Sequence, residues 1–341
     1  YIPDVESTNP AISMKLPTNL KASVTSTLQG VQELSNKTKN LNTRVIANRR
    51  DIDDLINKTV VNLQEEINGL NSKFNQFILN VKDFGARGDG ITDDTQAIQA
   101  AINYCSANSN RSLYIPNGTY LITDTVYIDA GIKIIGEHRK GVIFQCNFTD
   151  NDKPVFAIGQ NSPVSELYMG NFTMNGQLKG IALQIGSSIT NRVTDSTFEN
   201  IRIFNFNTGI YTTYAWCNLF KMVRIQSTIK PLTLASQTNA TKFDSCSFVS
   251  YSQPFTLSNC EGIIMDNCNI ANMTDTSADM MTIFQSNLTL NNPYFENTGK
   301  SLAQVGSGSE ALPSQLIING GLICKNVRLS GHNATIIING S

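Results

Sequence analysis

The chain has 341 residues, a formal net charge of −1 and only 16% charged residues. This balance excludes the basic field that nucleic-acid binding needs, and no apolar run is long enough for a membrane-spanning helix. The sequence does not predict a secretory signal, and because the chain begins at Tyr1 rather than Met we expect it to be a processed or partial sequence.

The N-terminal segment divides into two parts with different patterns. Residues 1–22 are predicted to form an extended attachment arm, because Pro3, Pro10 and Pro17 interrupt regular structure. Residues 23–79 instead place apolar side chains on two heptad seam positions, β-branched at one and leucine at the other. These are Val24, Val31, Val45 and Ile52, and Leu34, Leu41 and Leu55, with a one-residue slip of register after Thr59.

The heptads predict a self-associating coiled coil over residues 23–79. The alternative, an amphipathic helix folded onto its own domain, has to explain more than fifty residues of seam without a turn. Three polar seam residues, Thr38, Asn48 and Thr59, weaken the seam and can set its register. β-branched residues at one seam position and leucine at the other favour a parallel dimer.

Residues 81–105 predict a glycine-punctuated turn followed by a short helix. Thr92 is the predicted N-cap, and Asp93 and Asp94 suit the positive end of the helix dipole. The glycines do not form a phosphate loop, because the Lys-Ser/Thr ending of such a loop is missing. Residues 113–123 then predict a strand, a Pro-Asn-Gly turn and a second strand. The turn glycines are Gly85, Gly88 and Gly90, and the apolar stripe of the helix is Ala97, Ile98, Ala101 and Ile102.

Residues 81–136 together resemble the N-terminal signature of pectin-lyase-like right-handed β-helices, especially the form found in phage tailspikes and tail fibres. The resemblance implies that residues 81–105 form a lid on a β-solenoid spanning 80–341, and that they are not an active site. It also implies a homotrimer rather than a dimer, and attachment to other phage tail or baseplate proteins through the arm. It further implies a place in the virion, extracellular when acting, and a bacterial cell-surface polysaccharide as partner. Beyond residue 136 the resemblance is architectural.

A six-residue phrase recurs along the rest of the chain. Positions one, four and six are apolar or small, and positions two and three are turn residues, often Asn, which tolerates the left-handed conformation of a sharp corner. Each phrase therefore predicts a strand, a corner and a second strand, with Phe198, Phe220 and Phe243 stacked inward. Its copies end at Ile203, Ile225, Phe248, Ile270 and Phe295, spaced by 22, 23, 22 and 25 residues, and a weaker copy ends 28 residues later at Ile323.

A third strand is predicted between successive phrases. The segments 209–212, 232–234, 255–257 and 281–283 alternate apolar and polar residues, as half-buried strands do. Three strands per coil give an all-β right-handed parallel β-helix with coils about 4.8 Å apart. Cys246 and Cys268 take the same inward position in neighbouring coils, so the seven cysteines favour core packing over a disulfide framework.

The sequence lacks the catalytic motifs of the better-known β-helix enzymes. Gly-His-Gly and Arg-x-Lys motifs are absent, and the two histidines, His138 and His332, are too far apart along the solenoid for a dyad. The outward residues of the third strand, Tyr211, Thr233, Thr256 and Thr282, include no carboxylate. No residue pattern calls for a metal or a cofactor, so none is predicted.

Four aspartates are the candidate catalytic residues. Asp244 and Asp266 occupy phrase position two in successive coils, where a carboxylate pair can supply an acid and a base. Aspartates at a tight corner also satisfy backbone N–H groups, and this structural role is the favoured one. Asp275 and Asp279 lie in a long segment, 271–280, that interrupts the regular coil length, where a solvated loop is the commoner outcome.

The run from Tyr211 to Trp216 is the candidate glycan-binding segment. Tyr211, Tyr214 and Trp216 offer flat faces for sugar rings, and Trp216 is the single tryptophan of the chain. The alternative is that Trp216 packs beneath a corner of its coil.

Three functions remain open from the sequence. The first is a phage tailspike or tail-fibre protein that binds a bacterial surface polysaccharide. Whether it also degrades this polysaccharide is open from the sequence. The second is a secreted polysaccharide lyase or glycoside hydrolase, and the third is a structural baseplate spacer without catalysis.

Overall fold

A computed structural model describes residues 18–75, 78–108, 112–296, 300–306, 313–321, 328–329 and 333–340. The chain forms two compact units, Tyr1–Ser72 and Lys73–Ser341, which are described separately. Within the described residues, no helix combines the length and the apolar content that crossing a membrane requires.

The first unit is built on one uninterrupted helix, α1 (Thr18–Asn75). The helix begins within the predicted arm, so residues 18–22 are helical, and the rest of that arm lies outside the described residues. The early start has a simple reason: no proline occurs between Pro17 and Pro116 to stop the helix. The seam residues of α1 are exposed to solvent as far as Leu70.

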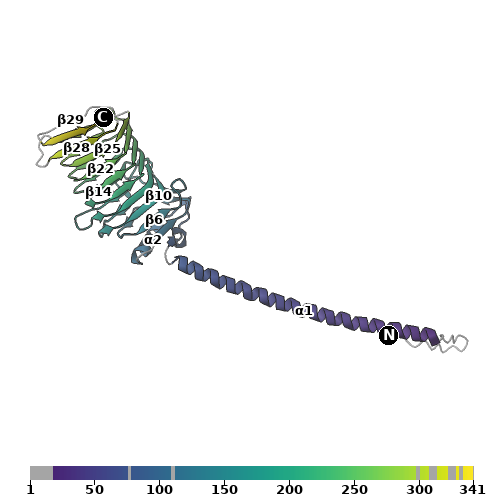
Figure 1. The fold of residues 1–341 in the computed structure, drawn as a ribbon. Coiled ribbons are helices and arrows are strands. Elements are labelled where there is room, and N and C mark those ends of the chain that lie inside the picture. Colours follow the sequence, from purple (N-terminus) through teal and green to yellow (C-terminus); the bar gives the residue numbers. More distant parts are fainter. Residues whose placement is uncertain are drawn as a thin grey trace. The chain divides into compact units, whose positions relative to one another are not determined.

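The second unit opens with the predicted lid. The 3-10 turn η1 (Val81–Phe84) leads through β2 (Asp89–Asp93) to helix α2 (Thr95–Ala107). The predicted apolar stripe is confirmed, because Ile98, Ala101 and Ile102 are fully buried and α2 contacts β3 (Ser112–Ile115) and β5 (Val126–Ile128). Figure 1 shows α2 at one end of the β-helix and β29 at the other.

The prediction that Thr92 is the N-cap is wrong. Asp89 accepts hydrogen bonds from the backbone N–H and the hydroxyl of Thr92, at 2.7 and 2.8 Å, which hold Thr92 in β2. The helix therefore begins at Thr95, with Asp94 as its N-cap residue. Asp94 does not cap through its side chain, because its carboxylate accepts the N–H groups of Arg87 and Gly88 instead.

The rest of the unit is the predicted right-handed parallel β-helix, with nine strands in its third-strand sheet within the described residues. That sheet consists of β5, β8 (Pro154–Ile158), β11 (Ile181–Ile185), β14 (Thr208–Thr213), β18 (Lys230–Ala235), β21 (Phe255–Ser258), β24 (Met281–Phe284), β27 (Ala303–Val305) and β29 (Arg328–Leu329). A short sheet consists of β9 (Val164–Ser165), β12 (Val193–Thr194) and β15 (Ala215–Trp216).

The largest sheet contains the strands on both sides of the phrase corner, and its register partners run parallel throughout. Its early strands are β1 (Ile78–Asn80), β2, β3, β4 (Gly118–Ile122), β6 (Lys133–Gly136), β7 (Val142–Cys146), β10 (Tyr168–Asn175) and β13 (Thr197–Phe204). The middle strands are β16 (Leu219–Lys221), β17 (Arg224–Thr228), β19 (Lys242–Asp244), β20 (Ser247–Tyr251), β22 (Ile263–Asp266) and β23 (Asn269–Met273). The last are β25 (Asn287–Asn291), β26 (Tyr294–Glu296), β28 (Ser314–Asn319) and β30 (Ala334–Asn339).

The phrase corners have the predicted left-handed backbone. Phrase position three has a positive φ in five successive copies, including Met222 and Ser245, which tolerate it less readily than Asn. The corner residues and their φ values are Asn200 (54°), Met222 (52°), Ser245 (54°), Asn267 (52°) and Asn292 (49°).

The predicted inward stack is confirmed. Neighbouring rings of Phe198, Phe220 and Phe243 have centroids 4.7 Å apart and nearly parallel planes. Cys246 and Cys268 are buried beside this stack, and six of the seven cysteines lie in the described residues as free thiols.

Candidate functional site

The strands that precede the corners carry an outward row of polar side chains at phrase position two. Asp244 on β19 and Asp266 on β22 are register partners in this row, so the predicted carboxylate pair does meet in adjacent coils. Their Cα atoms are about 4.8 Å apart, as in any parallel ladder. Asp244 itself accepts a hydrogen bond from the Ser245 hydroxyl at 2.9 Å.

Asp266 is the more tightly held of the two carboxylates. Lys242, on the same strand as Asp244, places its Nζ atom 2.6 Å from one oxygen of Asp266. The side-chain amide of Asn291 donates to the other oxygen at 2.7 Å. Partial burial alone would raise the pKa of Asp266, but these two hydrogen bonds outweigh it and hold the pKa below its ordinary value. The same contact with Asp266 raises the pKa of Lys242.

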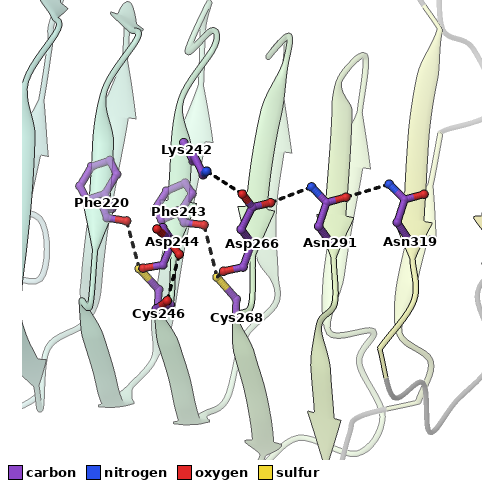
Figure 2. Close-up of polar contacts among 10 residues, drawn as sticks. Phe220, Lys242, Phe243, Asp244, Cys246, Asp266, Cys268, Asn291 and Asn319 are labelled. Carbon is purple, nitrogen blue, oxygen red and sulfur yellow. Dashed lines mark hydrogen bonds and ion pairs between the residues drawn. The ribbon is translucent and has the colours of Figure 1, made fainter.

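An asparagine ladder continues the row beyond Asp266. Asn291, Asn319 and Asn339 lie in successive coils, and each side-chain amide donates to the row member of the preceding coil, at 2.7, 2.7 and 2.8 Å. Figure 2 shows Asp266, Asn291 and Asn319 in this row, with Lys242 beside Asp266, and dashed lines mark the contacts between them. The ladder therefore ends on a carboxylate that has one partner at each oxygen.

The earlier coils of the row hold a second ion pair. Glu199 on β13 lies beside Lys221 on β16, with 3.1 Å between the charged atoms. The hydroxyl of Tyr168 donates to the other oxygen of Glu199 at 3.3 Å. The row thus holds Glu199, Lys221, Asp244 and Asp266 in successive coils before the asparagines begin.

The aspartates of the long segment do not join this row. Asp275 closes a local turn, and its pKa is lowered by hydrogen bonds from the hydroxyl and the backbone N–H of Ser277. Asp279 is buried and accepts a hydrogen bond from Ser301. The loop 274–280 thus lies between β23 and β24, and its two carboxylates have separate partners.

The three candidate aromatic residues are divided between two sheets. Tyr211 is in β14 of the nine-stranded sheet, whereas Trp216 is in β15 of the short sheet. Tyr214 lies between the strands with a left-handed φ of 48°, so the chain turns there. Trp216 donates its indole N–H to the Gln237 carbonyl at 2.7 Å, and the guanidinium of Arg192 lies 5.2 Å from its ring.

These residues can bind polar ligands but do not form an obvious acid–base pair. A proton donor needs a raised pKa, and Asp266 has a lowered one. His138 is exposed, and His332 lies outside the described residues. The part of the chain that the structure describes holds no group of three or more potential metal ligands.

Lys242 and the three asparagines were not predicted as site residues. The signal was available for two of them, because Asn291 and Asn319 occupy position two of the later phrases. Lys242 lies outside the phrase, and only the strand register shows that it reaches Asp266 rather than Asp244.

Comparison with known proteins finds a family model that matches the start of the β-helix. Residues 78–157 match the model of the rhamnogalacturonase A/epimerase, pectate lyase-like family. A probable glucan endo-1,3-beta-glucosidase from Arthroderma benhamiae is 49% identical over 113 residues, which are 31% of this chain and 12% of that protein. The chain spans about a tenth of the length of the curated relatives it matches.

Two phage proteins share the fold over most of the chain. ORF18 of Geobacillus virus E2 superposes with a TM-score of 0.58 and 18% identity, covering 82% of this chain and 63% of its own. The tailspike of Acinetobacter phage vb_AbaP_AS12 gives a TM-score of 0.57 and 16% identity, covering 72% and 45%. At these identities the similarity shows the fold alone. Residues 78–157 therefore match a pectate lyase-like family model, and they open a parallel β-helix whose fold is similar to that of the two phage proteins.

Proposed function

We propose that the chain is a tailspike- or tail-fibre-like protein of a phage virion, that it assembles as a parallel homotrimer, and that it binds a bacterial cell-surface polysaccharide. The observation that carries this proposal is the combination in one chain of a lidded β-helix with α1, a long helix whose apolar seam is exposed. Such a seam needs a partner, and a soluble polysaccharide-degrading enzyme has no need of it.

The seam supports assembly of copies through a coiled coil. Val24 is 43% exposed, and Leu34 and Leu55 are each 65% exposed, although all three are large apolar residues. A coiled coil buries such side chains between chains as knobs in holes. Three copies agree with the tailspike-like fold, although the seam composition alone favours two. Residues 1–22 and α1 would then join the β-helix to other tail or baseplate proteins.

The β-helix supports polysaccharide binding through its rigid outer rows. The Asp266–asparagine row presents amides and carboxylates at a fixed coil spacing, and sugar hydroxyls are suitable partners for both groups. Tyr211, Tyr214 and Trp216 remain the proposed stacking residues, now on two adjoining faces of the solenoid rather than on one platform.

Polysaccharide cleavage is the second candidate function, and the pectate lyase-like match favours it. The matched residues end at 157, before the coils that carry Asp244, Asp266, Asp275 and Asp279. In this alternative Asp266 acts as the charged partner, because its lowered pKa suits a base and not a proton donor.

The experiment is incubation of the full chain with purified host capsule, teichoic acid and lipopolysaccharide. Retention of one polymer without release of new reducing ends or unsaturated products supports a binding protein. Release of either product identifies an enzyme. Retention of none of the polymers would leave the baseplate-spacer function as the better description.

A further inference from the structure

Two arginines lie side by side on the strands that follow the corners. Arg202 on β13 and Arg224 on β17 are register partners, so both side chains project from the same face in adjacent coils. Arg224 is exposed and Arg202 is half-buried. None of the ion pairs among the described residues includes either arginine. Like charges directly opposite each other in a ladder are destabilising, so this pair is costly in the free protein.

The Arg202 guanidinium is held in place by its neighbours. It lies over the ring of Phe204, 4.8 Å from the centroid, and its Nη2 donates to the side-chain carbonyl of Gln226 at 3.4 Å. Phe204 and Gln226 are themselves register partners, two residues beyond the arginines on the same strands. The Nε atom of Arg202 is buried and has no hydrogen-bond partner within the described residues. One donor of a fixed guanidinium is therefore left unsatisfied.

The charges around the pair do not neutralise it. Glu199, the carboxylate on the same strand as Arg202, lies before the Asn200 corner and is bound by Lys221 and Tyr168. In the coil after Arg224, its register partner is Ser247, which is uncharged.

The coil before Arg202 adds no acidic side chain at the equivalent position. Thr173, the register partner of Arg202 in that coil, donates its hydroxyl to the Arg139 carbonyl at 2.6 Å. The backbone of segment 138–140 therefore passes beside Thr173 in the coil before Arg202.

We propose that Arg202 and Arg224 form a binding site for the acidic group of an anionic polysaccharide. Carboxylate, phosphate and sulfate share the planar or branched oxygens that two neighbouring guanidinium groups bind through paired hydrogen bonds. Such a group offsets the repulsion between the arginines, of which Arg224 is exposed and Arg202 is half-buried. The inference rests on the proposed polysaccharide-binding function, and it adds that the ligand is acidic and where it is held.

The test uses the full chain and four immobilised polymers. Polygalacturonate, glycerol-phosphate teichoic acid and dextran sulfate supply the three acidic groups, and dextran is the neutral polymer. Affinity is measured at low and at physiological ionic strength for the wild type and for Arg202→Gln/Arg224→Gln. The matched control is Lys133→Gln/Lys230→Gln, which removes the same two charges from exposed lysines of β6 and β18. Circular dichroism confirms that each variant is folded.

The expected result is binding of at least one acidic polymer by the wild type, weakened at least about tenfold in the arginine variant. The lysine control should lose about twofold or less, and the difference between the variants should shrink as salt is added. Equal losses in both variants would show a diffuse charge effect and overturn the proposal. Failure of the wild type to bind any acidic polymer would overturn it too, whereas binding of a neutral host polysaccharide would still leave the proposed function standing.

Discussion

Lys242 forms its ion pair with Asp266 of the following coil, with 2.6 Å between Nζ and a carboxylate oxygen, and not with Asp244, which lies two residues along its own strand. The two aspartates are ladder neighbours, yet only Asp266 receives the lysine and an asparagine amide. Equivalent sequence positions thus acquire different chemistry from their partners in the adjacent coils. Asp266 remains charged near neutral pH and cannot serve as the acid of a two-carboxylate mechanism.

The first prediction concerns Asp244, Asp266, Asp275 and Asp279. Replacing each by Asn keeps its size, removes its charge and leaves a side chain that still forms hydrogen bonds, so retention on the bound polysaccharide should change by no more than about twofold. Affinity and product release are measured on the same samples. A variant that binds normally but has lost a cleavage activity of the wild type would show that this aspartate is catalytic and that the binding-only function is wrong.

The second prediction concerns Trp216. Its ring is half-buried and its N–H is bonded to Gln237, so Trp216→Phe keeps an aromatic face while Trp216→Ala removes it. If the face stacks on a sugar, the alanine variant should lose about tenfold in affinity and the phenylalanine variant should lose less. Tyr211→Ala tests the neighbouring sheet in the same assay. Unchanged binding in the folded Trp216→Ala variant would remove Trp216 from the site.

The third prediction concerns the aromatic stack in the core. Phe220 lies between Phe198 and Phe243 at 4.7 Å from each, and it is fully buried. Phe220→Ala should lower the free energy of unfolding by about 3–5 kcal/mol per chain, as truncation of a buried Phe does. Chemical denaturation measures this, with outward-facing Thr233→Ala as a control that should cost about 1 kcal/mol or less. Equal midpoints for the two variants would contradict the importance of the stack.

The fourth prediction concerns assembly. Light scattering of the full chain should give the mass of three copies of 37.4 kDa. Removal of residues 1–75, which ends with α1 and spares β1, should reduce association more than it disturbs the β-helix, because each coil buries its own core. A monomeric or dimeric mass for the full chain would refute the homotrimer.

The fifth prediction concerns acid stability of the lid. Hydrogen bonds from the backbone of Thr92 and Ile91, and from the Thr92 hydroxyl, lower the pKa of Asp89 from 3.8 to about 2. A carboxyl group whose pKa is lower in the folded state stabilises the protein at pH values above its ordinary pKa. This contribution is lost as the pH falls toward the lowered pKa. Between these two values, the urea midpoint of the wild type should therefore fall more than that of Asp89→Asn. Asp83→Asn, at an exposed aspartate of η1, is the control and should follow the wild type.

The repeating parts of this fold were predictable because one local pattern recurs in every coil. The apolar positions of the phrase predicted the Phe198–Phe220–Phe243 stack, and its turn positions predicted the corners. The left-handed corners at Met222 and Ser245 follow from their place in the phrase and not from their residue type. The start of α2 was missed because Asp89, three residues earlier, captures Thr92 before it can cap the helix.

The candidate sites were less predictable because they depend on contacts between coils. The turn at Tyr214 separates Tyr211 from Trp216, which a linear aromatic run does not reveal. The Arg202–Arg224 pair was visible as phrase position five in two successive copies, 22 residues apart. The sequence alone does not indicate a binding site at this pair. The structure shows that Phe204 and Gln226 hold the Arg202 guanidinium and that no ion pair among the described residues includes it.

The asparagine ladder also makes the coil an independent unit of change. Every amide of the row donates toward the lid, so each coil presents an acceptor to the coil that follows it. A whole coil with Asn at phrase position two can therefore be inserted or lost between two others without leaving an unsatisfied bond in the row. Such an event would move the downstream rows by one coil spacing, while Arg202 and Arg224 keep their distance from the lid. The length of the solenoid can therefore evolve separately from the position of its arginine pair.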